Sequence, residues 1–321
     1  MSVNLGMSSG KIFLAPMEGV VDHIMRDLLT AVGDYDLCVT EFIRVTNQLY
    51  KPALFHRFCP ELKQGGRTPA GTPVRVQLLG QDPDWMAENA VRAVELGSPG
   101  VDLNFGCPAK TVNRNKGGAV LLKEPETLYR IISTVRRAVP ADQPVSVKMR
   151  LGYDDKSLVL DNARAVEAAG ADLLTIHART RTEGYRPPAH WHVIARVREV
   201  VRLPLVANGE IWSADDAQSC RRESGCDDIM IGRGALSLPN LSRCIRAGAP
   251  PLDWDGVKRL LIRYAGEKRP EHGAGFLPAR IKQWFTYLRR QYPEAEQMFV
   301  RLKRLQNLED IVALLRDGET V

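Results

Sequence analysis

The stretch Gly100-Val101-Asp102-Leu103-Asn104-Phe105-Gly106-Cys107-Pro108 decides the fold class of this chain of 321 residues. Its first seven residues are typical of a buried strand, and a thiol follows directly at the strand's end. Strands of parallel sheets and barrels carry active-site residues at their carboxyl ends. Pro108 then turns the chain out of the sheet. Cys107 alone stays ambiguous, because most buried cysteines only fill space in a core.

Seven further apolar, β-rich segments surround this one, and stretches of helical pattern separate them. The eight segments are Lys11–Met17, Leu37–Phe42, Val74–Gly80, Gly100–Gly106, Val145–Gly152, Leu173–Arg179, Leu203–Ile211 and Asp228–Gly234. Helices are expected at Pro83–Leu96, Pro125–Val139, Leu158–Ala169, Trp191–Val200 and Ala214–Glu223. Eight alternating strand–helix units favour a (β/α)₈ barrel, that is, a TIM barrel, over an open sheet.

The remaining segments divide the chain. Residues 43–73 form a long polar connection with little helical pattern, which is typical of a functional or mobile loop. Pro250-Pro251 mark a boundary, and beyond them only helical periodicity appears, at Val257–Tyr264, Leu277–Arg290 and Glu294–Leu315. We therefore expect a flexible N-terminus at 1–10, a barrel at 11–249 and a small all-α helical domain at 250–321.

The composition indicates a soluble cytoplasmic protein. Hydrophobic residues make up 44% of the chain and charged residues 26%, and no apolar run approaches the length of a membrane span. The polar start lacks the apolar core of a signal peptide. Six cysteines show neither a Cys-x-x-Cys pair nor a zinc-site spacing, so we expect reduced thiols and no metal. We expect a monomer with no membrane partner.

Positive charge is concentrated near the C-terminus. Residues 258–304 contain twelve Lys or Arg against four Glu and no Asp, an excess larger than the net charge of +6 of the whole chain. Aromatic residues lie among these charges, including Trp284 and Tyr287. Such a segment can bind a phosphate backbone, or it can be a solvated helical face with aromatic residues in its core.

Polar residues recur at the predicted carboxyl ends of the strands. They are Pro16-Met17-Glu18, Gln77, Asn104, Cys107, Lys148, His177, Asn208-Gly209-Glu210 and Gly232-Arg233-Gly234. Each alone has a structural explanation, such as a core ion pair or a loop-tethering amide. Together on one rim they predict a site, because unpaired buried polar groups are costly.

The last two groups predict a phosphate site. Glycine turns after strands seven and eight expose backbone N–H groups where barrels commonly bind phosphate, and Arg233 adds a positive charge. A cofactor with its phosphate there would put its ring over the barrel mouth. Lys148 and Gln77 would then lie within reach of the ring of a flavin, where a cation stabilises the reduced form.

With these residues assembled, the chain resembles the tRNA-dihydrouridine synthases, most closely their bacterial C-type branch. The motifs that carry the resemblance are Ala15–Val20, Tyr35–Phe42, Val74–Gly80, Asp102–Lys110, Gly117–Ala119, His177–Thr180, Ala207–Trp212, Met230–Ala235 and Ala279–Trp284. The likeness runs from about residue 11 to about residue 305, and this combination of motifs is highly specific.

The resemblance implies an FMN enzyme that uses NADPH, or NADH, to reduce the C5–C6 bond of a tRNA uridine. Hydride passes from the flavin to uracil C6, and a cysteine thiol protonates C5 from the opposite side. Carried over to this chain, Cys107 is the proton donor. The positions implied for FMN are Pro16, Met17, Glu18, Gln77, Lys148, His177, Asn208, Gly209, Glu210, Gly232 and Arg233.

The resemblance also implies how tRNA is bound. Asn104 and Tyr185 are expected near the target base, which must leave its stack to reach a buried ring. The C-type branch implies the uridine at position 16 of the D-loop. The positions expected to contact tRNA on the barrel rim and the helical domain are Arg44, Arg280, Lys282, Tyr287 and Lys303.

Two other functions remain open on the sequence. A small-molecule FMN oxidoreductase of the dihydropyrimidine or dihydroorotate dehydrogenase type would explain the rim but not the basic C-terminal helices. A non-catalytic RNA-binding protein on a retained barrel would explain the charge but not Cys107 together with Lys148.

Overall fold

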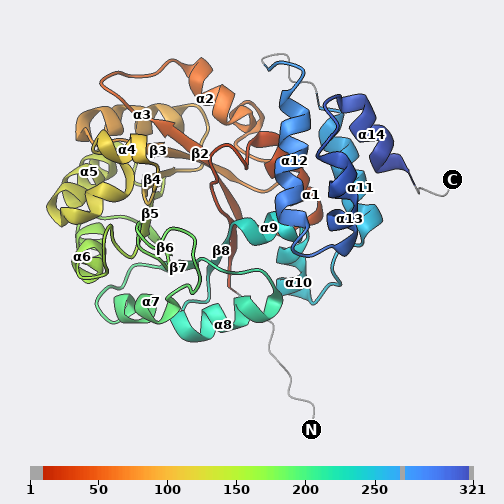
Figure 1. The fold of residues 1–321 in the computed structure, drawn as a ribbon. Helices are drawn as coiled ribbons and strands as arrows, with labels where there is room; N and C mark the ends of the chain where they lie inside the picture. Colours follow the sequence, from red (N-terminus) through yellow and green to blue (C-terminus); the bar gives the residue numbers. More distant parts are fainter. Residues whose placement is uncertain (1–9, 268–271, 318–321) are drawn as a thin grey trace, which may run out of the picture.

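The computed structural model describes residues 10–267 and 272–317. Eight parallel strands close into a barrel, in which β1 pairs with both β2 and β8 (Figure 1). The strands are β1 (Ile12–Leu14), β2 (Leu37–Arg44), β3 (Val74–Leu79), β4 (Val101–Phe105), β5 (Val145–Arg150), β6 (Leu173–His177), β7 (Leu205–Asn208) and β8 (Ile229–Ile231). Each lies within or close to a predicted segment, so the predicted barrel is confirmed.

Helices surround the barrel on the outside (Figure 1). Those of the barrel region are α1 (His23–Val32), α2 (Pro52–Phe58), η1 (Pro60–Gln64), α3 (Pro83–Glu95), α4 (Lys110–Arg114), η2 (Gly118–Lys123), α5 (Pro125–Ala138), α6 (Val159–Ala168), α7 (Trp191–Arg198), α8 (Ala214–Ser224), α9 (Arg233–Ser237) and α10 (Leu241–Ala247). Local signals explain where they begin. Asp82 accepts hydrogen bonds from the N–H groups of Asp84 and Trp85 at the start of α3, and Pro83 occupies its first turn.

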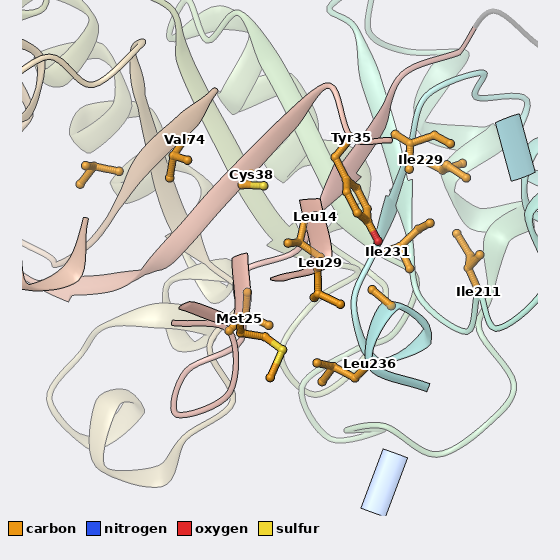
Figure 2. Packing of buried hydrophobic residues seen from close by; sticks show 14 of the residues in the cluster. Leu14, Met25, Leu29, Tyr35, Cys38, Val74, Ile211, Ile229, Ile231 and Leu236 are labelled. Atoms are coloured by element: carbon orange, nitrogen blue, oxygen red, sulfur yellow. The ribbon is translucent and has the colours of Figure 1, made fainter. Parts of the chain in front are cut away.

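Alternation along each strand separates two environments. In β5, Val145, Val147 and Met149 belong to the core between strands and helices. The alternate residues of the strand, which include Lys148 and Arg150, face the barrel interior, as alternation predicts. Figure 2 shows part of the outer core, where Leu14 of β1 and Leu29 of α1 belong to one buried cluster.

The barrel interior is itself divided. Strands β1, β2, β7 and β8 contribute an apolar cluster of buried side chains, which are Phe13, Ala15, Leu37, Val39, Val206 and Met230. Strands β3, β4 and β5 contribute buried polar side chains instead, among them Gln77, Asp102 and Ser146. Packed apolar residues thus close one side of the interior, and hydrogen-bonding groups line the other.

The connection at 43–73 is not the helix-poor loop that we expected. It contains α2 and η1, each of which begins at a proline. The buried guanidinium of Arg26 fixes them, because it donates to both carboxylate oxygens of Glu61, at 2.8 and 3.0 Å, and to the carbonyl of Phe58 at 2.9 Å. Helices this short have too few turns to show periodicity, but proline at a first helical position was a usable signal.

The C-terminal part consists of helices packed beside the barrel, next to α1 and α9 (Figure 1). They are α11 (Trp254–Ala265), α12 (Phe276–Leu288), α13 (Pro293–Leu302) and α14 (Leu308–Arg316). The helical periodicity over Glu294–Leu315 corresponds to two helices, α13 and α14, with a break between them. Asn307 takes an extended conformation (φ −89°, ψ 143°), and the break lets Leu302 and Ile311 both become fully buried.

Residues 1–9 of the predicted flexible N-terminus lie outside the described residues. So do Lys268 and Arg269, two members of the predicted basic segment. In the part of the chain that the structure describes, no helix is both long enough and apolar enough to cross a membrane.

Candidate active site

A cavity of about 620 Å³ opens at the carboxyl ends of the strands. This volume lies in the usual range for sites that bind small molecules and cofactors. Its lining includes all eleven positions expected to hold a cofactor, which are Pro16, Met17, Glu18, Gln77, Lys148, His177, Asn208, Gly209, Glu210, Gly232 and Arg233. Cys107, Asn104, Tyr185 and Tyr287 line the same cavity. Residues that are far apart in the sequence therefore share one space.

Hydrogen bonds hold the backbone of Cys107 on both sides. Its N–H donates to the side-chain oxygen of Asn104 at 3.0 Å. Its carbonyl accepts from the side chain of Asn113 at 3.0 Å and from the N–H of Ala119 at 3.1 Å. Gly118 has a φ of +67°, and a Cβ there would meet the Cys107 carbonyl at 2.9 Å. The loop after β4 therefore fixes where the thiol lies.

The Cys107 side chain is 7% exposed and packs in a small apolar cluster with Phe42, Leu79 and Val112. Burial raises the pKa of the thiol, and the nearby charges of Arg44 and Arg150 only partly oppose this effect. The group is therefore a protonated thiol at neutral pH. Such a thiol is suited to donate a proton rather than to attack as a nucleophile.

Lys148 lies on β5, the strand next to β4, where it is the register partner of Asn104. Its ammonium donates to the side-chain oxygen of Asn208 at 3.1 Å. Burial lowers the pKa of Lys148 to about 8, and the neighbouring charge of Arg150 acts in the same direction. At pH 7 most of the molecules therefore carry a positive charge at this half-buried position on the cavity wall.

His177, at the end of β6, is buried near several cations. Burial, followed by the charges of Arg150 and Lys148, lowers its pKa well below the ordinary value. The imidazole is therefore neutral at pH 7. One of its ring nitrogens can donate a hydrogen bond and the other can accept one.

The turn after β7 brings the backbone close to the cavity. Gly209 has a φ of +119°, and a Cβ at this residue would lie 2.8 Å from Cδ2 of His177. Only glycine therefore fits between the strand end and the imidazole. The next residue, Glu210, accepts from the Nε1–H of Trp212 at 2.8 Å and forms an ion pair with Arg179.

Arg233 follows β8 and lies between two aromatic rings. Its guanidinium carbon is 4.8 Å from the ring centre of Tyr185 and 4.9 Å from that of Trp212. Its nearest carboxylate oxygen is that of Glu210, at 3.6 Å. Since the contacts to the rings leave donors of the guanidinium free, Arg233 can still bind an anion at the cavity wall.

The positions expected to contact tRNA lie in different surroundings. Arg44 is exposed near the cavity mouth, where its charge influences Glu18 and Cys107. Lys303 is exposed and Lys282 is half-buried, and neither forms an ion pair with a carboxylate of the described residues. None of the three lines the cavity.

Arg280 is occupied within the protein. Its guanidinium donates to the carbonyls of Gly19 and Val20 in the loop after β1 and to the hydroxyl of Tyr264, and it lies 3.5 Å from Asp22. Its side chain is only 10% exposed. The residue therefore ties α12 to the loop that carries Pro16–Glu18, so it is a poor candidate for a free phosphate contact in this arrangement.

Sequence reasoning missed several lining residues. Trp212 and Thr286 are examples. Trp212 lies beyond the end of β7, outside the positions that alternation assigns to the rim. Thr286 comes from α12, so only the packing of that helix against the barrel mouth brings it to the site. No group of three or more His, Cys, Asp or Glu side chains suited to a metal occurs among residues 10–267 and 272–317.

Comparisons with solved structures show proteins of similar fold. Solved structures of similar fold include a variant of NCR from Zymomonas mobilis (TM-score 0.55, 18% identity, 81% of this chain and 92% of that one). A 2-naphthoyl-CoA reductase is another (TM-score 0.58, 15% identity, 75% of this chain and 50% of that one). At such identities the likeness concerns the fold alone.

Sequence relatives are much closer. The chain is 55% identical to a tRNA-dihydrouridine(16) synthase of Shewanella oneidensis over 309 residues, which are 96% of this chain and 98% of that protein. It is 52% identical to the protein of that name from Escherichia coli K12, over 95% of this chain and 98% of that one. Residues 13–258 match the family described as dihydrouridine synthase (Dus). The chain therefore belongs to the dihydrouridine synthase family.

Proposed function

We propose that this protein is a flavin-dependent oxidoreductase, a tRNA-dihydrouridine(16) synthase that reduces the C5–C6 bond of a uridine in the tRNA D-loop. The observation that carries the proposal is the cavity, which is lined both by a protonated thiol after β4 and by a lysine of the neighbouring strand β5. Relatives of that name, 55% and 52% identical over 96% and 95% of this chain, support both the reaction and position 16.

We assign FMN as the cofactor and NADPH, or NADH, as the reductant. The lining suits a flavin: Arg233 and the backbone N–H groups of the glycine turns after β7 and β8 can bind a phosphate. Lys148, Gln77 and neutral His177 offer hydrogen-bond donors to ring carbonyls and nitrogens. Bound FMN supplies the hydride that goes to uracil C6.

The residues of this chain supply the rest of the reaction. Lys148 holds a positive charge in a buried place, where it stabilises electron density on a neighbouring ring. Cys107 holds a proton on sulfur for delivery to C5 of the uracil, and the Asn104 side chain keeps the thiol's loop in place. The apolar contacts of Phe42 and Leu79 disfavour the ionised form of the thiol.

We propose that tRNA lies across the cavity mouth and the C-terminal helices. Tyr185 is 53% exposed at the mouth, and Tyr287 of α12 lines the cavity, so both can contact a uracil that has left its stack. Arg44, Lys282 and Lys303 offer positive charges for phosphates. Arg280 affects tRNA binding indirectly, because it fixes the position of α12 against the barrel. We expect a cytoplasmic monomer.

The small-molecule oxidoreductase is not favoured, because the sequence relatives are named for tRNA. The non-catalytic alternative leaves the protonated Cys107 thiol and the charged Lys148 without a role.

The proposal is tested with purified protein and with tRNA from cells that lack the gene. We expect a yellow protein with flavin absorbance, which converts uridine 16 to dihydrouridine when NADPH is added. Mapping of dihydrouridine along the tRNA measures the result, and tRNA without NADPH is the control. A colourless protein, or a flavoprotein that leaves every uridine intact, would contradict the proposal.

A further inference from the structure

A continuous chain of buried polar side chains runs through the barrel interior and ends at the backbone of Cys107. It consists of Arg75 and Gln77 of β3, Asp102 and Asn104 of β4, and Ser146 of β5. Each is at most 9% exposed, and Asp102 is 2% exposed. Because these side chains are largely removed from bulk solvent, each bond helps to fix the orientation of its neighbour.

The bonds follow one another without a gap. The Ser146 hydroxyl accepts from Arg75 at 3.0 Å and donates to one oxygen of Asp102 at 2.5 Å. The other Asp102 oxygen accepts from the amide nitrogen of Gln77 at 2.7 Å. The amide oxygen of Gln77 in turn accepts from the amide nitrogen of Asn104, also at 2.7 Å.

The donor-to-acceptor direction of this series of hydrogen bonds is set at both of its ends. The N–H groups of Gly106 and Cys107 donate to the oxygen of Asn104, at 2.9 and 3.0 Å, so its amide nitrogen must face Gln77. At the other end, the Asp102 oxygen that faces Gln77 accepts from the amide nitrogen at 2.7 Å. The Gln77 amide therefore has one possible orientation, with its nitrogen toward Asp102 and its oxygen toward Asn104.

This orientation matters for the cavity. An amide nitrogen carries two hydrogens, and the bond to Asp102 uses one of those on Gln77. Gln77 lines the cavity and Asp102 does not. The second N–H of Gln77 is thus left for an acceptor in the cavity, such as a ring carbonyl.

We propose that Asp102 is a positioning residue, which fixes the Gln77 amide so that its N–H meets a carbonyl of the bound flavin ring. The inference rests on the proposed function, since it assumes that the ring is a flavin. Without the Asp102 acceptor, only the bond from Asn104 holds the amide, so the amide plane can rotate and turn its second N–H away from the ring. Asp102 thus acts on the cofactor only through Gln77.

A double-mutant cycle tests this inference, with the FMN dissociation constant as its readout, measured by quenching of flavin fluorescence. Asp102→Ala should raise the dissociation constant about tenfold, the worth of one hydrogen bond to a buried group. In a Gln77→Ala background the same change should alter it less than about twofold, because the amide is already gone. Equal effects of Asp102→Ala in both backgrounds would overturn the inference.

Asp102→Asn is the conservative variant, and it keeps the inference testable if the alanine variant does not fold. The new amide can accept from Gln77 with its oxygen and donate to Ser146, whose hydroxyl can turn to the Val101 carbonyl at 3.3 Å. We expect FMN affinity within about threefold of the parent. An effect as large as that of Asp102→Ala would mean that the charge matters, not the orientation, and would overturn the inference. A parent protein without flavin affinity would instead refute the proposed function.

Discussion

Burial shifts the three central ionisable groups of the cavity toward their neutral forms. It raises the pKa of the Cys107 thiol and lowers the pKa values of His177 and Lys148. The protonation states at pH 7 differ because the ordinary pKa values of the three groups differ. The thiol keeps its proton at pH 7, the imidazole is neutral, and Lys148, with a pKa of about 8, still carries its charge. One physical effect thus produces an acid, a neutral hydrogen-bonding group and a cation.

A buried ammonium should cost stability in the flavin-free protein. Between about pH 8 and about pH 10.5 the unfolded chain binds a proton at Lys148 that the folded protein does not, so stability rises with pH in that window. We expect Lys148→Met to be more stable than the parent at pH 7 by about 3 kcal/mol, with the difference vanishing near pH 10.5.

Urea unfolding of both proteins between pH 7 and about pH 10.5 measures this difference in stability. The matched control is Lys282→Met, a change at a half-buried lysine of α12. A Lys148→Met variant that is less stable than the parent at pH 7, or a pH-independent difference, would show that Lys148 is not desolvated.

At the scale of single elements, two signals predicted the strands: alternating residues along each segment, and glycine or proline residues at the ends of segments. Alternation is informative because each strand buries one face against a helix. The same signals failed where an element has too few residues for a period, as in α2 and η1. They also failed between α13 and α14, where apolar spacing continues through a break in the backbone. Burial of Leu302 and Ile311 accompanies that break, and Asn307 as N-cap, with Glu309 and Asp310 in the first turn of α14, was a local signal that the apolar spacing obscured.

The turn after β7 offers a test at this scale. Gly209→Ala forces a side chain into a positive φ and pushes a Cβ against His177, so we expect a decrease of about 2 kcal/mol in stability and weaker flavin binding. Gly65→Ala is the control, since Gly65 has a φ of +73° but no atom within 4 Å of the new Cβ.

Thermal unfolding and flavin titration compare the two variants. Gly65→Ala should decrease stability by about 1 kcal/mol and leave flavin affinity unchanged. If Gly209→Ala behaves in the same way as Gly65→Ala, His177 does not depend on the close approach of this turn.

At the scale of the molecule, the residues predicted for the cofactor, together with Asn104, Cys107, Tyr185 and Tyr287, all line one cavity. Strand order and alternation made most of this predictable, because they determine which side chains meet at a barrel mouth. Thr286 could not be placed in this way, since it depends on how α12 packs against the barrel. Nor could the binding of Arg280 to the loop after β1 be foreseen, since a free and a tethered arginine look alike in a sequence.

The packing of the C-terminal helices beside the cavity predicts how salt affects tRNA binding. We expect Lys282→Ala and Lys303→Ala together to weaken binding and to lower the slope of log affinity against log salt by about 1 for each phosphate that is no longer neutralised. Flavin content should not change, since neither residue lines the cavity.

Binding measured from low to moderate salt tests this expectation. Arg202→Ala is the control, because Arg202 is exposed in the loop before β7, on the face opposite the cavity mouth. An unchanged slope in the double variant, or an equal effect of Arg202→Ala, would place the tRNA elsewhere.

The most direct test of the central claim is single-turnover reduction of tRNA by the pre-reduced enzyme with Cys107→Ala. The account predicts normal flavin content and normal reduction of the flavin by NADPH, but formation of dihydrouridine slowed by about 10²–10⁴-fold, because only the proton donor is missing. Cys226→Ala, a change at a buried thiol outside the cavity, should leave the rate equal to that of the parent. Equal rates for Cys107→Ala and the parent would contradict the account.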